Sequence, residues 1–145
     1  MKRLRKEESG QAFVELVVIL PFLFITIAAL VFFGRVLYAK LALDMASYDA
    51  CRAAVEALRP DDGQQQGLTA GRETLSGFYM NAASAQLTVA SNGTWGRGVW
   101  VSCNSRYNLY VGDIPLVTLF NAGRTVPLSA KTWSRIETWR SWWQR

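Results

Sequence analysis

Histidine is absent from the 145 residues of this chain. Its absence excludes Ser-His-Asp and Cys-His catalysis, zinc sites with histidine ligands, and the most common general base of enzymes. A hydrolase would need a nucleophile beside a base, and Asp61, Asp62 and Asp113 have no evident partners for that chemistry. The two cysteines, Cys51 and Cys103, stand too far apart to form a metal site. We therefore expect no enzyme, no metal and no cofactor.

Charged residues are also scarce, at 19% of the chain against about 25% in typical soluble domains. The deficit is local, because no ionisable residue lies between Glu15 and Arg35. The net charge is only +5, and no basic stripe occurs beyond the N-terminal segment. A balance this mild does not favour nucleic acid as a partner.

The charge-free stretch is an apolar run, LVVILPFLFITIAALVFF, over residues 16–33. Eighteen residues at about 1.5 Å each span roughly 27 Å as a helix, close to the hydrocarbon thickness of a bilayer. A chain of about one domain is too small to surround such a helix on every side. The sequence therefore predicts a transmembrane helix at residues 11–34, with the lipid bilayer as a partner.

A basic cluster precedes the apolar run and consists of Lys2, Arg3, Arg5 and Lys6. Basic residues beside a membrane helix favour the cytoplasmic side, so we expect a cytoplasmic N-terminus and an extracytoplasmic chain after Gly34. The run is longer than that of a cleaved secretory signal, and no small-x-small cleavage site follows it directly. These features predict a single-pass protein of the inner (cytoplasmic) membrane.

The basic segment of residues 1–10 ends in Gly10, and Glu15 is the fifth residue after this glycine. This pattern resembles the class III signal of type IV pilin-like proteins, which a prepilin peptidase cuts after the glycine. The resemblance implies a leader of residues 1–10 and cleavage between Gly10 and Gln11. In pilin-like proteins the glutamate is thought to neutralise the new amino terminus of a neighbouring subunit. In a low dielectric such an ion pair would set the register of packed helices.

A longer pattern begins with GQAFVELVVILP and continues through FFGRVLYAK and DMASYDACRAAVEAL. The segments VWVSCNSRYNLY, IPLVTLF and VPLSAKTWSRIE follow toward the C-terminus. Together, over most of residues 10–137, they resemble the TadE family of tight-adherence (Flp-type) pilus proteins. Leu16 departs from the pattern, because many members have an aromatic residue after the glutamate.

The resemblance implies a pilin-like minor subunit or assembly factor of a tight-adherence pilus that acts by helix packing. Its implied partners are a prepilin peptidase, other pilin-like subunits and pilus assembly proteins. Such a subunit enters the fibre, caps it or primes its assembly. The alternative function is an unprocessed single-pass membrane-anchored binding module of an envelope or secretion apparatus.

Beyond Gly34 apolar residues recur every three or four positions, which predicts that the helix continues through residues 35–58. These residues are Leu37, Leu41, Met45, Tyr48, Cys51, Val55 and Leu58. We expect this stripe to face a domain packed against the helix. Proline and glycine in residues 59–63 end the helix, and residues 64–67 are interpreted as a linker.

Residues 59–137 form the predicted extracytoplasmic α+β domain. A second helix over residues 68–83 is expected to bury Leu75, Phe78 and Tyr79.

The remaining segments alternate apolar and polar residues. Residues 87–89 and 99–101 predict a hairpin with its turn at 91–93, and a further strand covers 126–132, with Pro127 marking an edge. The predicted fold class is α+β: a long N-terminal transmembrane and amphipathic α-helix with a small extracytoplasmic domain that contains a second helix and an antiparallel β-sheet.

Cys51 falls on the predicted helix and Cys103 in a predicted strand. Outside the cytoplasm a disulfide is favoured over two buried thiols. The pairing requires Cα atoms within about 7 Å, and Cys103 on the same side of its strand as Val99 and Val101.

The C-terminal tail, residues 138–145, is rich in tryptophan and arginine. We interpret Trp139, Trp142 and Trp143 as a partner surface, whereas Trp133 is expected to complete the core. Tryptophan beside arginine is compatible with nucleic-acid stacking, membrane-interface contact or protein binding.

Overall fold

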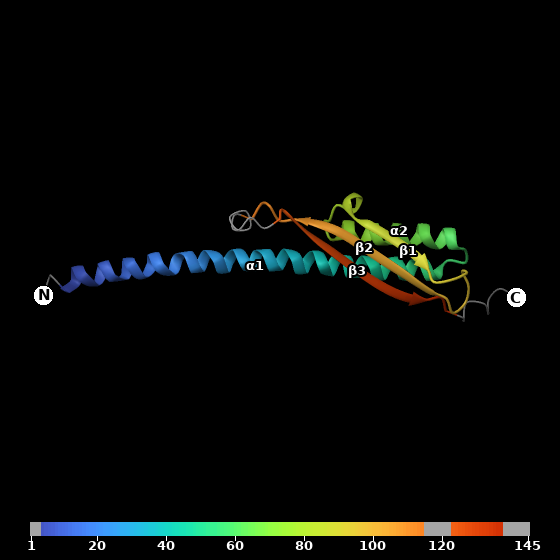
Figure 1. The fold of residues 1–145 in the computed structure, drawn as a ribbon, viewed down its shortest axis with the longest axis horizontal. Coiled ribbons are helices and arrows are strands. Elements are labelled where there is room, and N and C mark those ends of the chain that lie inside the picture. Colours follow the sequence, from blue (N-terminus) through green and yellow to red (C-terminus); the bar gives the residue numbers. More distant parts are fainter. Residues whose placement is uncertain (1–3, 115–122, 138–145) are drawn as a thin grey trace. The chain divides into compact units, whose positions relative to one another are not determined.

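The computed structural model of this protein describes residues 4–114 and 123–137, without the side chains of residues 4–10 and 12. Its elements follow one another along the chain (Figure 1). They are α1 (Leu4–Glu56), α2 (Pro60–Gly77), a short 3-10 helix (Ala82–Ser84), β1 (Gln86–Ser91), β2 (Trp100–Tyr110) and β3 (Thr125–Arg135). The predicted α+β class is confirmed.

The chain divides into two compact units. Unit 1 comprises residues 1–35 with 111–124, and unit 2 comprises residues 36–110 with 125–145. Since α1 runs from Leu4 to Glu56, it contributes its N-terminal part to unit 1 and its C-terminal part to unit 2.

In unit 1, α1 presents large apolar side chains that no other described element covers. Phe24 is 61% exposed and Leu30 is 68% exposed. The polar Thr26 hydroxyl is satisfied inside the helix, because it donates to the carbonyl of Phe22 at 2.8 Å. This part of α1 therefore exposes an almost uninterrupted apolar surface.

Unit 2 is built on a three-stranded antiparallel sheet with the order β1-β2-β3. The predicted hairpin joins β1 to β2, and Gly93 adopts a φ of 130° in the loop between them. Pro127 lies on β3, an edge strand, as its missing N–H predicted.

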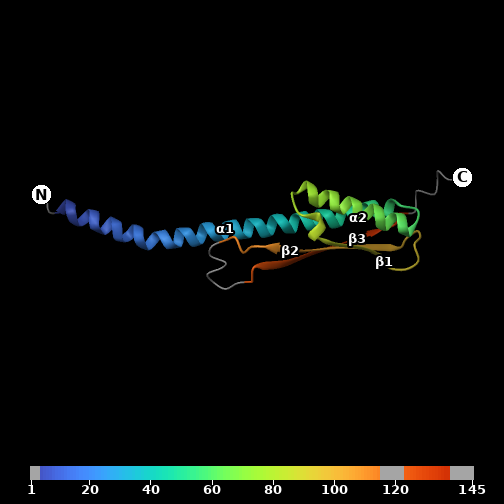
Figure 2. The same cartoon turned by 90° about the horizontal axis from the view of Figure 1, so that it is seen from above.

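The C-terminal part of α1 and all of α2 lie on one side of this sheet (Figure 2). The two helices approach closely because Gly63, Gly67 and Gly71 recur every four residues and are buried. A Cβ atom at Gly67 would lie 2.7 Å from the carbonyl oxygen of Ala50. Only glycine lets the two backbones come so near.

The predicted bounds of the second helix were wrong. α2 begins at Pro60 and ends at Gly77, so residues 64–67 are helical rather than a linker. Proline is favourable in a first helical turn because its missing N–H would have no helical partner there. The negative charges of Asp61 and Asp62 in the same turn interact favourably with the positive N-terminal end of the helix dipole.

The prediction that the apolar stripe of α1 faces the packed domain was mostly wrong. Cys51 is buried and Val55 is partly buried, whereas Leu37, Leu41, Met45, Tyr48 and Leu58 are exposed. The buried face of the helix consists of Ala39, Ala42, Leu43, Ala46, Ser47, Ala50, Cys51 and Ala54. Small side chains occupy it because α2 and the sheet lie close to the helix axis.

Two aromatic residues expected in the core are exposed. Tyr79 is 96% exposed with a φ of 54°, because it follows the end of α2, whereas Leu75 is buried and Phe78 is partly buried. Trp133 is 49% exposed. Side chains alternate along β3, and Trp133 therefore points to the face opposite Thr132, its neighbour near the helices.

Candidate functional site

The residues of the predicted processing site all lie within α1. Gly10, Gln11 and Glu15 have helical backbone, and the side chains of Gln11 and Glu15 are exposed. Glu15 directly precedes the apolar run, so an exposed carboxylate stands at the border of the apolar surface. Cleavage between Gly10 and Gln11 and the role of Glu15 stay predictions.

The apolar surface of α1 has the dimensions of a membrane span. Among the described residues, the stretch Phe13–Glu56 is the one helix long and apolar enough to cross a membrane. Its most apolar window has a mean hydropathy of 3.0, and none of that window is buried. A contiguous apolar surface of this size requires lipid or other apolar helices around it.

An ion pair stands just beyond this surface in unit 1. Nη1 of Arg35 donates to both carboxylate oxygens of Asp113 at 2.7 Å. The hydrogen bond from Arg35 lowers the pKa of Asp113 below its usual value, and this effect outweighs the opposing effect of desolvation. The sequence alone offers no evident partner for Asp113, because Arg35 is 78 residues away in the chain.

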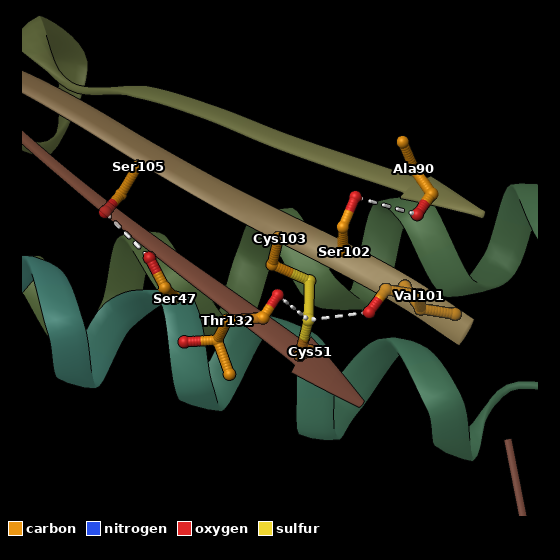
Figure 3. Close-up of a disulfide and its surroundings, with 8 residues drawn as sticks. All are labelled: Ser47, Cys51, Ala90, Val101, Ser102, Cys103, Ser105 and Thr132. Atoms are coloured by element: carbon orange, nitrogen blue, oxygen red, sulfur yellow. Dashed lines mark hydrogen bonds between the residues drawn. A yellow bond between two sulfur atoms is a disulfide. The ribbon is translucent and has the colours of Figure 1, made fainter. Parts of the chain in front are cut away.

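In unit 2, a disulfide links Cys51 of α1 to Cys103 of β2 (Figure 3). The Cα atoms are 5.5 Å apart, so the predicted pairing and its distance are confirmed. The Cys51 sulfur lies 3.6 Å from the carbonyl oxygen of Val101 and 3.5 Å from that of Thr132. The bridge therefore fastens α1 beneath both β2 and β3.

A pair of buried serines makes a second connection one helical turn earlier. The hydroxyls of Ser47 and Ser105 are 2.8 Å apart (Figure 3). The Ser105 hydroxyl donates to the carbonyl of Leu43 at 3.0 Å. Ser47 then donates to Ser105, which satisfies both hydroxyls. This contact was not predicted from the sequence. Its signal was the spacing, with Ser47 four residues before Cys51 and Ser105 two residues after Cys103.

A groove of about 380 Å³ lies beside the disulfide, between α1 and β3. Its charged lining residues are Arg52, Glu56, Arg135 and Glu137, so positive and negative groups balance. In the part of the chain that the structure describes, no three His, Cys, Asp or Glu side chains gather as a metal site would require. The predicted partner surface of Trp139, Trp142 and Trp143 lies outside the described residues.

A family model described as TadE-like protein matches residues 10–52. Over this segment the chain is similar to TadE-like proteins. The match begins at Gly10, includes Glu15 and the exposed apolar helix, and ends one residue after Cys51. The predicted resemblance is therefore confirmed for the helical part of the chain. The TadE-like family suggests a role in the assembly of tight-adherence pili and an association with pilus assembly components. No curated protein and no solved structure matches the sequence.

Proposed function

We propose that this protein is a pilin-like minor subunit or assembly factor of a tight-adherence pilus, anchored by α1 in the inner membrane. The observation that carries the proposal is the TadE-like match over residues 10–52, which coincides with the long apolar helix. In this proposal the protein performs no chemistry of its own. It acts by packing its helix against the helices of other pilin-like subunits.

The surface of α1 supports such a role. Large side chains such as Phe24 and Leu30 are exposed along the helix, and the hydroxyl of Thr26 is already satisfied. In a membrane, association of helices depends on van der Waals packing, and an apolar surface without unsatisfied polar groups is suited to it. The same surface is compatible with lipid before assembly and with neighbouring helices afterwards.

Processing after Gly10 would complete the subunit. Removal of residues 1–10 would expose an amino group at Gln11, one helical turn from Glu15. A carboxylate near the membrane interior is costly unless it is paired with a positive group. We propose that Glu15 of one subunit pairs with the new amino terminus of its neighbour.

The disulfide supports an extracytoplasmic unit 2. Disulfides persist outside the cytoplasm and are rare within it. Together with the basic residues before the span, the Cys51–Cys103 bridge favours a cytoplasmic N-terminus and a C-terminal part on the opposite side of the membrane.

Intact-mass measurement tests the processing step. The full chain is expressed with and without a prepilin peptidase, and we expect loss of residues 1–10 only when the peptidase is present. Gly10→Val should block this loss, since it puts a bulky side chain where glycine allows the backbone to approach the protease closely. Gly34→Val is the matched control, because Gly34 lies in the same helix with no atom within 4 Å of its added Cβ. A wild-type chain that keeps Met1–Gly10 beside an active peptidase would contradict processing and favour the unprocessed membrane anchor.

A second experiment tests the role of Glu15. Glu15→Gln should leave cleavage intact but remove cross-links between the protein and other pilus subunits in the native membrane. Glu73→Gln is the matched control, because it removes the same charge from an exposed position of α2. Unchanged cross-linking in Glu15→Gln would contradict the proposed ion pair.

A further inference from the structure

The face of the sheet turned away from α1 and α2 carries aromatic and basic side chains. We call it the open face and define it by Trp100, Arg106 and Tyr110 of β2 and by Lys131, Trp133 and Arg135 of β3. All six residues are exposed. None of the strands β1, β2 and β3 contains an aspartate or glutamate. Within the three strands the open face therefore carries three basic residues and no acidic one, while Glu137, just beyond β3, lies near Arg135 in the groove beside α1.

The register of the sheet arranges these side chains in neighbouring rows. Trp100 lies opposite Arg135, and the next row holds Trp133 opposite Ser102. One row further, Lys131 lies opposite Asn104. Rows on one face of a sheet are about 7 Å apart, so aromatic and basic groups alternate at short intervals along the strands.

The aromatic side chains are accessible rather than covered. Trp100 and Trp133 are each 49% exposed, and Tyr110 is 53% exposed. The Nζ atom of Lys131 lies 4.2 Å from the ring centroid of Trp133, which places a cation directly beside an aromatic surface. Neighbouring exposed aromatic side chains on one face are typical of a binding surface, because a fold gains stability when it buries such rings.

The charges and rings of this face indicate an anionic partner with flat units. Arginine and lysine bind carboxylates or phosphates by charge-assisted hydrogen bonds. Indole and phenol rings stack on flat faces of sugars or bases. Asn104 lies opposite Lys131, and Asn108 lies between Arg106 and Tyr110 along β2, where their amides can bond to hydroxyl groups. A polymer with carboxylates, ring faces and many hydroxyls satisfies all three kinds of side chain.

We propose that the open face binds an acidic polysaccharide, a chain of sugars that bear carboxylate groups. Single-stranded nucleic acid would also stack on tryptophan, but the disulfide favours a compartment outside the cytoplasm. An anionic lipid surface offers phosphates, yet it presents few ring faces to Trp100 and Trp133. The proposal does not depend on leader processing or on entry into a pilus.

Calorimetric titration of the full chain in uncharged detergent micelles tests the proposal. The probe is an oligomer of polygalacturonate, and a dextran oligomer is the neutral comparison. We expect binding of polygalacturonate that weakens as salt rises, and no binding of dextran. Arg106→Gln/Lys131→Gln and, separately, Trp133→Ala should each lower the affinity at least tenfold.

The matched control is Arg59→Gln/Arg72→Gln, which removes the same charge from exposed positions at and within α2. It should bind polygalacturonate like the wild type. An intact disulfide and an unchanged melting curve show that each variant is folded, and Trp133→Phe should keep most of the affinity because it keeps a ring.

Two results would overturn the proposal. Equal affinities for the wild type and the open-face variants would exclude this face as the binding site. Tighter binding of oligothymidylate, or of phosphatidylglycerol vesicles, through the same residues would assign the face to nucleic acid or to lipid instead.

Discussion

The two parts of α1 differ in what they bury, although they belong to one continuous helix. In unit 1 nearly all the large apolar side chains from Phe13 to Phe33 are exposed, and none of the most apolar window is buried. In unit 2 the buried face consists mostly of alanine, serine and cysteine, while Leu37, Leu41 and Met45 are exposed. The hydropathy of a helix thus indicates whether its surroundings are apolar. The size of its buried side chains indicates how closely other helices and strands pack against it.

The small residues of unit 2 have an energetic consequence. Only a few large side chains are fully buried there, chiefly Leu43, Leu75 and Val101. Alanine and glycine bury little apolar area, so the hydrophobic contribution to folding is modest. The Cys51–Cys103 bridge and the Ser47–Ser105 contact fasten α1 to β2 where large side chains do not.

Negative charges introduced into the two parts of α1 should differ most in their effect on membrane insertion. Phe24→Asp/Ile27→Asp introduces two carboxylates into the apolar run, at about 3 kcal/mol each, and should raise the free energy of membrane insertion by about 6 kcal/mol. We expect a clear drop in the fraction that stays in membranes after alkaline extraction. Leu41→Asp/Met45→Asp alters side chains that are also about half exposed and should leave this fraction unchanged. Equal extraction of both variants would contradict a membrane around unit 1.

Removal of the disulfide should be the largest single loss within unit 2. The bridge joins residues 52 positions apart, and the chain-entropy relation gives about 4 kcal/mol for a loop of this length. Cys51→Ala/Cys103→Ala should therefore unfold at a markedly lower denaturant concentration than the wild type. Thiol labelling of the denatured wild type should be absent before reduction and should modify two cysteines afterwards. Free thiols in protein purified from its native membrane would argue against an extracytoplasmic unit 2.

The close approach of α1 and α2 should tolerate no added methyl group at its centre. The new Cβ of Gly67→Ala would lie 2.7 Å from the backbone oxygen of Ala50, which must shift, and we expect a loss of about 1–3 kcal/mol. Gly77→Ala is the control, since no atom lies within 4 Å of its Cβ, and its unfolding free energy should be unchanged or slightly higher. Denaturation of both variants in the same detergent compares them. A Gly67→Ala variant as stable as the wild type would refute the tight contact.

This contact also explains which features the sequence predicted and which it did not. The charge-free run, the hairpin turn and Pro127 act locally, so the span, the β1–β2 pair and the edge strand were predicted from them. Glycine was interpreted as a helix breaker, which is correct for an isolated helix. At Gly63 and Gly67, however, the close contact with α1 makes glycine the favourable residue in α2. This contact cannot be read from the sequence of α2 alone.

The candidate sites divide in the same way. The disulfide was predicted because only two cysteines exist and a compartment was inferred for them. The open face was missed because Trp133 was expected to complete the core, whereas its exposure depends on which side of β3 the helices cover. Arg106 and Lys131 likewise belong to one surface only because the register of β2 and β3 places them on the same face of the sheet.

The ion pair of unit 1 should give the smallest effect, visible mainly in a titration. Nη1 of Arg35 donates to both oxygens of Asp113, and this hydrogen bond keeps the pKa of Asp113 below its usual value. A carboxyl with a lowered folded pKa contributes stability above its unfolded pKa of about 3.9, and the contribution is lost as pH falls through the folded pKa. Because the pair is exposed, salt should weaken it. Carboxyl NMR should show the pKa of Asp113 rising in Arg35→Gln and staying unchanged in Arg72→Gln, and equal values in the two variants would show that Arg35 does not act on Asp113.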